Sequence, residues 1–146
     1  ASLCAMCPTP GPALICLTDA QLFDPSPQGR RSLVLGGGRV LWSGPERPEW
    51  PSGFPVQTID LAGRTLIPGL VDCHAHLAGG GGEAGFASRV PAPGLSRYVA
   101  AGVTTAVGLL GTDDTLRSIE ELSAVAQGLG EEGLSTWFWT GGYHLP

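Results

Sequence analysis

The stretch from Ile67 to Gly85, IPGLVDCHAHLAGGGGEAG, constrains the fold more than any other part of the sequence. Its centre, Leu70 to Leu77, has the character of a short apolar strand and ends at four consecutive glycines. Alternate residues of a strand face the same way. Three polar side chains should therefore project to one side: Asp72, His74 and His76. The side chains that face the other way are small and apolar, as expected where helices cover a sheet: Val71, Cys73 and Ala75.

The two histidines form a candidate metal site. Two residues of strand rise place His74 and His76 roughly 7 Å apart along the backbone, which lets both rings converge on one ion. An arbitrary His-x-His pair is more often a structural pair with satisfied hydrogen bonds. This pair lies on an otherwise apolar strand just before a glycine-rich loop, and that context favours metal ligation.

After the glycine loop, helical and strand patterns alternate. Residues 95–101 predict a short helix ended by Gly102, and residues 104–110 predict a buried strand. Thr112 or Asp113 is expected to cap a second helix. The apolar stripe of that helix has three- and four-residue spacing: Leu116, Ile119, Leu122, Ala126 and Leu129. With a third strand at 135–140, this alternation predicts a parallel sheet with right-handed crossovers.

The first sixty residues show short strands and turns. Residues 13–23 and 56–61 predict strands, and a hairpin is expected between 32–35 and 39–42 because Gly36 to Gly38 allow the positive φ of such turns. No chemistry is visible in this part of the chain.

Composition excludes several classes of function. The net charge of −5 and the lack of a basic cluster argue against nucleic-acid binding, and no run reaches the ~18 apolar residues that span a bilayer. The four cysteines give no convincing disulfide framework: Cys4, Cys7, Cys16 and Cys73. We expect them to be reduced, Cys73 on a buried strand face, in a cytoplasmic protein.

The segment Pro68 to His76 resembles the PG-hydrophobic-D-x-H-x-H motif of the amidohydrolase superfamily. Further blocks resemble one family within it, the β-aspartyl (isoaspartyl) dipeptidases: Gly79–Gly85, Leu95–Arg97, Ala101–Thr104, Gly108–Asp113 and Thr140–His144. The resemblance is dense from Leu66 to Pro146 and only general before it.

The resemblance implies an α/β fold, the N-terminal part of a (β/α)8 TIM barrel preceded by half of a small β-sandwich. Residues 1–65 would be the partial sandwich, and residues 66–146 the first three β/α units. The candidate site residues all follow the carboxyl ends of expected strands, where active sites lie in such barrels.

The implied activity is zinc-dependent hydrolysis of β-aspartyl dipeptides. His74 and His76 would hold one of two zinc ions, Glu83 would receive the substrate's α-ammonium, and Gly81 and Thr112 would hydrogen-bond the substrate. Tyr143 would donate its hydroxyl to the developing oxyanion. Without the resemblance, Glu83 would be interpreted as a solvated loop carboxylate and Tyr143 as a strand-end aromatic.

The sequence also departs from the family pattern. A complete barrel needs about 250 residues, and all eight basic residues here are arginines, so the lysine that bridges the two metals in this family is absent. Two further histidines and a late catalytic aspartate are also missing. We therefore expect an inactive N-terminal fragment of an enzyme that is a homo-oligomer when full length. Two alternatives stay open: another amidohydrolase acting on cyclic amides or N-acyl amino acids, and a truncated non-catalytic product.

Overall fold

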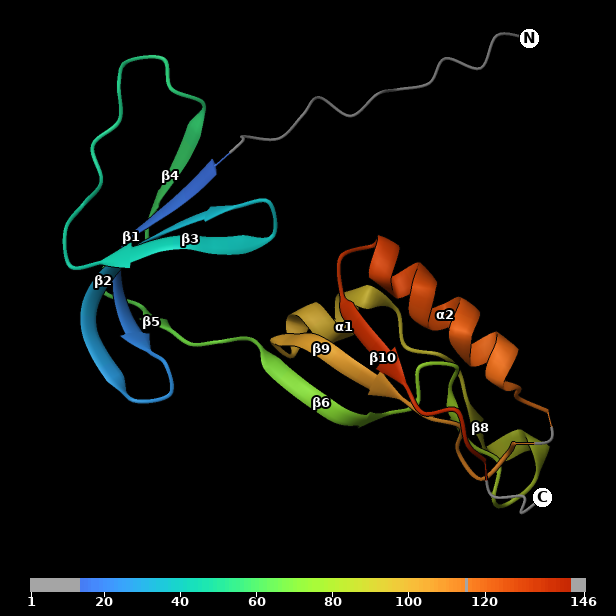
Figure 1. The fold of residues 1–146 in the computed structure, drawn as a ribbon. Helices are drawn as coiled ribbons and strands as arrows, with labels where there is room; N and C mark the ends of the chain where they lie inside the picture. The colour runs from blue at the N-terminus through green and yellow to red at the C-terminus, as the bar shows by residue number, and fades with distance from the viewer. Residues whose placement is uncertain (1–13, 115, 143–146) are drawn as a thin grey trace, which may run out of the picture. The chain divides into compact units, whose positions relative to one another are not determined.

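The structure, a computed structural model, describes residues 14–114 and 116–142 and divides into two compact units, residues 1–68 and 69–146 (Figure 1). Among the described residues, no helix is both long and apolar enough to cross a membrane.

The first unit is built on one mixed sheet in which the longest strands lie side by side. Its strands are β1 (Leu14–Phe23), β2 (Pro27–Gly36), β3 (Arg39–Gly44), β4 (Val56–Asp60) and β5 (Thr65–Leu66). The order is β3-β2-β1-β4, with β5 also on β1; β2 pairs with its neighbours antiparallel, whereas β4 and β5 run parallel to β1. The expected glycine hairpin is confirmed, because Gly37 and Gly38 take φ values of 55° and 71° between β2 and β3.

The second unit contains a parallel three-stranded sheet with strand order β10-β9-β6. The strands are β6 (Leu70–Ala75), β9 (Val103–Gly108) and β10 (Ser135–Phe138), and the helices are α1 (Leu95–Ala100) and α2 (Ile119–Glu131). The predicted strand–helix alternation and the parallel pairing are confirmed. Between β6 and α1 the chain forms a small antiparallel pair, β7 (Gly80–Gly81) and β8 (Arg89–Val90), with the 3-10 turn η1 (Phe86–Ser88) between them.

The core of the second unit forms where α2 packs along β10 (Figure 1). Leu77 and Leu122 are completely buried there. Gly108 on β9 lies beneath both, since a Cβ at this position would come within 2.7 Å of Leu77 and 3.0 Å of Leu122. Glycine at this position thus lets Leu77 and Leu122 pack closely against β9.

Two sequence expectations about the helices and strands are wrong. Helix α2 is capped by Ser118, whose hydroxyl accepts a hydrogen bond from the Glu121 N–H. Ser-x-x-Glu is the sequence pattern of a capping box, and the helix begins at Ile119. Leu116 therefore precedes the helix, does not belong to its apolar stripe, and is 53% exposed. Cys73 is exposed, because β6 is an outer strand and the helices pack on β9 and β10 instead.

Candidate metal and substrate site

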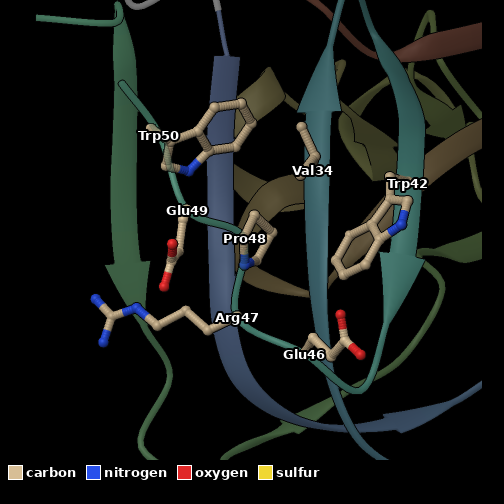
Figure 2. Close-up of a pocket in the computed structure, with 7 residues that line it drawn as sticks. All are labelled: Val34, Trp42, Glu46, Arg47, Pro48, Glu49 and Trp50. Carbon is tan, nitrogen blue, oxygen red and sulfur yellow. The ribbon is translucent and has the colours of Figure 1, made fainter. Parts of the chain in front are cut away.

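Two of the hollows formed by the described residues, one in each unit, are compared as candidates for the site. The first, of about 510 Å³, lies over Val34 in the first unit, with Trp42 and Trp50 on opposite sides and Pro48 between them (Figure 2). Its charged residues are exposed, and none of the described residues that line it carries an imidazole or a thiol. The second, of about 700 Å³, lies in the second unit against His74 of β6 and His76, which follows the strand. We therefore place the candidate site in the second hollow.

The histidine pair lies as the strand periodicity predicts. The ring centroids of His74 and His76 are 5.3 Å apart, and the rings are nearly perpendicular, at 87°. Asp72 faces the same hollow, and its Oδ1 accepts a hydrogen bond of 3.0 Å from the His74 N–H. The carboxylate therefore stabilises the strand end from which both rings project.

Two glycines, Gly80 and Gly111, lie close against the ring of His76. A Cβ on Gly80 or on Gly111 would come within 3.3 Å of His76 ring carbons. The Nδ1 atom of His76 is buried and has no hydrogen-bond partner among the described residues. A buried polar atom without a partner is uncommon, and such atoms commonly bind a water molecule or an ion.

These observations fit a metal ion in part. Two imidazoles whose centroids are 5.3 Å apart and a buried ring nitrogen without a partner are compatible with zinc, which takes four ligands in tetrahedral sites. No group of three or more His, Cys, Asp or Glu side chains placed to hold a metal occurs within residues 14–114 and 116–142. The two candidate ligands predicted from the sequence, His74 and His76, therefore lie together without a third such side chain among the described residues.

The loop after β6 requires glycine for its path. Gly79, Gly81 and Gly82 have φ values of 91°, 67° and 110°, a region that other residues rarely adopt. At Gly81 an added Cβ would lie 2.4 Å from the Ser88 carbonyl oxygen. The run of glycines therefore lets the loop fold back closely on itself at the rim of the hollow.

Glu83 and Thr112 are brought together although 29 residues separate them. The Thr112 hydroxyl donates a 2.9 Å hydrogen bond to Glu83 Oε1. The pKa of Glu83 is lowered, first by its own backbone N–H, then by this hydroxyl, and further by the charges of His76 and Arg117. The carboxylate is therefore ionised at neutral pH, and the hydroxyl of Thr112 keeps only its acceptor capacity.

Two further site residues were predicted from the sequence, Gly81 and Tyr143. Gly81 lines the hollow beside the histidines. Tyr143 lies outside the described residues, so its role stays a prediction.

Two residues that the sequence did not single out also face this region. Tyr98 of α1 lines the hollow and is 7% exposed; burial, and then the charge of Asp72, raises the pKa of its phenol, which stays protonated and able to donate. Arg117 is 3% exposed and reaches back into the glycine loop. Its sequence signals were two acidic residues, Asp113 and Asp114, four and three positions earlier.

Comparison with known proteins identifies the family of this region. Residues 57–125 match the amidohydrolase family. This segment is similar to the amidohydrolase family. It includes the histidine strand, the glycine loop and the Glu83–Thr112 pair.

The relatives of this segment carry two different names. The chain is similar to a crystal structure of β-aspartyl dipeptidase from Fervidobacterium islandicum AW-1 in complex with a β-Asp-Leu dipeptide, with 38% identity, a TM-score of 0.88, and coverage of 94% of this chain and 36% of that one. It is 39% identical over 102 residues to imidazolonepropionase from Acidiphilium cryptum, covering 68% of this chain and 23% of the relative. A putative prolidase from Bifidobacterium longum, at 17% identity and a TM-score of 0.61, shares the fold. The chain thus spans about a quarter of the length of its curated relatives and about a third of the solved dipeptidase.

Proposed function

We propose that the protein containing this chain, called the parent protein below, is a metal-dependent β-aspartyl dipeptidase. In this proposal residues 1–65 are half of a β-sandwich and residues 66–146 are the first three units of a TIM barrel. Its support is the likeness to the solved dipeptidase, which extends over 94% of this chain at 38% identity. The likeness to imidazolonepropionase has the same identity level but extends over 68%.

The observation that carries the substrate assignment is the ionised Glu83 carboxylate beside the histidine hollow. A β-aspartyl dipeptide carries a free α-ammonium close to the side-chain amide that is cleaved. A carboxylate on the loop that leaves the histidine strand can hold this ammonium by a charge-assisted hydrogen bond. Thr112 orients one carboxylate oxygen and leaves the other for the substrate.

The proposed cofactor is zinc, two ions per site, one of them held by His74 and His76. When bound, zinc supplies Lewis-acid polarisation of the amide carbonyl and an activated water at neutral pH. The residues of this chain bind and orient the substrate: Glu83 holds the ammonium, and Gly81 permits close approach of the substrate to the backbone. Tyr143 is proposed to hydrogen-bond the oxygen on which negative charge develops.

The remaining elements of the proposal concern the parent protein as a whole. We propose that it acts on small dipeptides in the cytoplasm and assembles as a homo-oligomer. Ligands beyond the two imidazoles would come from outside the described residues.

Replacing Glu83 by Gln in the parent protein tests the substrate assignment. The change removes the charge and keeps the shape, so kcat/KM for β-aspartyl-leucine should fall by about ten- to a few-hundred-fold, the range of a charged hydrogen bond. Metal content should not change. Full activity of this variant would refute the role of Glu83 and favour a cyclic-amide hydrolase.

Glu120 offers a matched control. It is also an exposed glutamate with a lowered pKa and a hydrogen bond from a serine, Ser118, but it lies on α2. Glu120→Gln should leave kcat/KM within about twofold of the wild type, since surface substitutions away from special features have small effects.

A second candidate function is opening of a cyclic amide ring, favoured by the sequence likeness to imidazolonepropionase. Such a substrate has no α-ammonium beside the scissile bond. The charge that Glu83→Gln removes should therefore not matter for kcat/KM on the cyclic substrate. The non-catalytic alternative predicts that the parent protein hydrolyses neither class.

A further inference from the structure

A single buried side chain, Arg117, fastens the glycine loop to the segment between β9 and α2. Its guanidinium donates to four loop carbonyls: Ala78 at 3.2 Å, Gly80 at 2.9 Å, Val90 at 3.3 Å and Gly81 at 3.4 Å. Arginine suits this task because its planar group carries five donors in a fixed fork. No other side chain in the described part of the chain has hydrogen bonds recorded to this many loop carbonyls.

The charge of Arg117 is balanced by a shared carboxylate. Asp113 Oδ2 lies 3.5 Å from Arg117 and 3.0 Å from Arg89 on β8. The carboxylate is largely buried, with 13% of its side chain exposed. Arg117, Asp113 and Arg89 thus form a clamp that joins the β7–β8 hairpin to the segment that follows β9.

The loop depends on this clamp because glycines hardly restrict their own backbone. Three of its four consecutive glycines have positive φ, and glycine loses more conformational freedom on folding than any other residue. Glu83 follows directly, and among the described side chains Thr112 is the one with a hydrogen bond to its exposed carboxylate. Arg117 holds the backbone before Glu83, and Thr112 holds the Glu83 carboxylate. Both residues lie in the segment between β9 and α2.

We propose that Arg117 is a positioning residue that sets where Glu83 stands relative to the histidine pair, and thereby selects substrates with an α-ammonium. The inference rests on the proposed function. It predicts that loosening the clamp weakens recognition of the ammonium more than hydrolysis itself.

The test uses Arg117→Lys in the parent protein with two substrates, β-aspartyl-leucine and N-succinyl-leucine, which is the same molecule without the α-amino group. Lysine keeps the charge but cannot span four carbonyls. The preference for β-aspartyl-leucine, as a ratio of kcat/KM values, should shrink by about tenfold or more, the size of a weakened charged hydrogen bond. Arg89→Lys is the matched control, because a lysine can keep its single contact with Asp113, and it should change the ratio by less than about threefold.

Hydrogen–deuterium exchange provides a readout that does not depend on activity. Arg117→Lys should speed exchange in peptides covering residues 79–90 and leave β9 and α2 protected, whereas Arg89→Lys should change the loop little. Asp113→Asn, which keeps the shape and removes the shared charge, gives a second variant if Arg117→Lys does not fold, with the same direction of change.

Equal losses on both substrates would overturn the proposal, because a merely structural residue lowers both alike. Unchanged exchange in the loop would overturn it as well. A wild-type parent protein that cleaves neither substrate refutes the proposed function and the selective role together, and the exchange result then reports separately whether Arg117 holds the loop.

Discussion

Gly81→Ala is the sharpest perturbation of the glycine loop that the structure allows. Its added Cβ would lie 2.4 Å from the Ser88 carbonyl oxygen, a backbone atom that cannot rotate away. Ordinary contact begins near 3.4 Å, so the loop must open by about 1 Å (from 2.4 to 3.4 Å). A displacement of about 1 Å in a positioning element can lower activity by about 100-fold.

Gly102→Ala isolates the steric part of this effect. Gly102 has a similar φ, 74° against 67° for Gly81, but a Cβ there would meet nothing within 4 Å. It should show only the conformational penalty of a left-handed residue, about 1–2 kcal/mol of stability, and keep kcat/KM for β-aspartyl-leucine within about threefold.

The assay is kcat/KM of the parent protein on β-aspartyl-leucine, with metal content measured for each variant. We expect Gly81→Ala to lose about 100-fold, equivalent to about 2.7 kcal/mol, with metal retained. If the two alanine variants have equal activity, the loop does not position the substrate and the reasoning fails.

Three further predictions concern the core, the carboxylate and the undescribed tyrosine. Leu122→Ala should destabilise the protein by about 2–5 kcal/mol because Leu122 is fully buried, whereas Leu116→Ala, at 53% exposure, should shift the melting temperature little; equal shifts would contradict the packing. Thr112→Val should raise the pKa of Glu83 toward its usual 4.5, because a donor to the carboxylate is lost. The ionised form of Glu83 disappears as pH falls through this pKa, so NMR of the carboxyl carbon should show protonation at a higher pH in the variant than in the wild type. An unchanged titration would exclude the Thr112 effect. Tyr143→Phe should lower kcat more than it raises KM, because its proposed hydrogen bond strengthens as charge develops; a change confined to KM would contradict that role.

The periodicity of the sequence was enough to predict the longer strands and the shared side of the two histidines. A strand repeats every two residues, so His74 and His76 had to share a face, and their ring centroids lie 5.3 Å apart. The apolar stripe of α2 likewise fixed which of its residues are buried, Leu122, Ala126 and Leu129. These features depend on residues close together in the chain.

Features that depend on distant contacts could not be predicted in the same way. The start of α2 was misplaced because Thr112 and Asp113 looked like caps, whereas Thr112 bonds Glu83 and Asp113 pairs with two arginines. The exposure of Cys73 follows from strand order, which local pattern does not contain. Arg117 donates hydrogen bonds to carbonyls up to 39 residues away. Every residue has a backbone carbonyl, so the sequence does not show which ones accept.

Hydrolysis by the metal-loaded parent protein, measured side by side on β-aspartyl-leucine and imidazolonepropionate, tests the central claim most directly. The account predicts release of aspartate and leucine from the dipeptide, loss of this activity on removal of metal, and no ring opening of imidazolonepropionate. Ring opening without dipeptide hydrolysis would contradict the assignment of Glu83 to an α-ammonium and with it the proposed function.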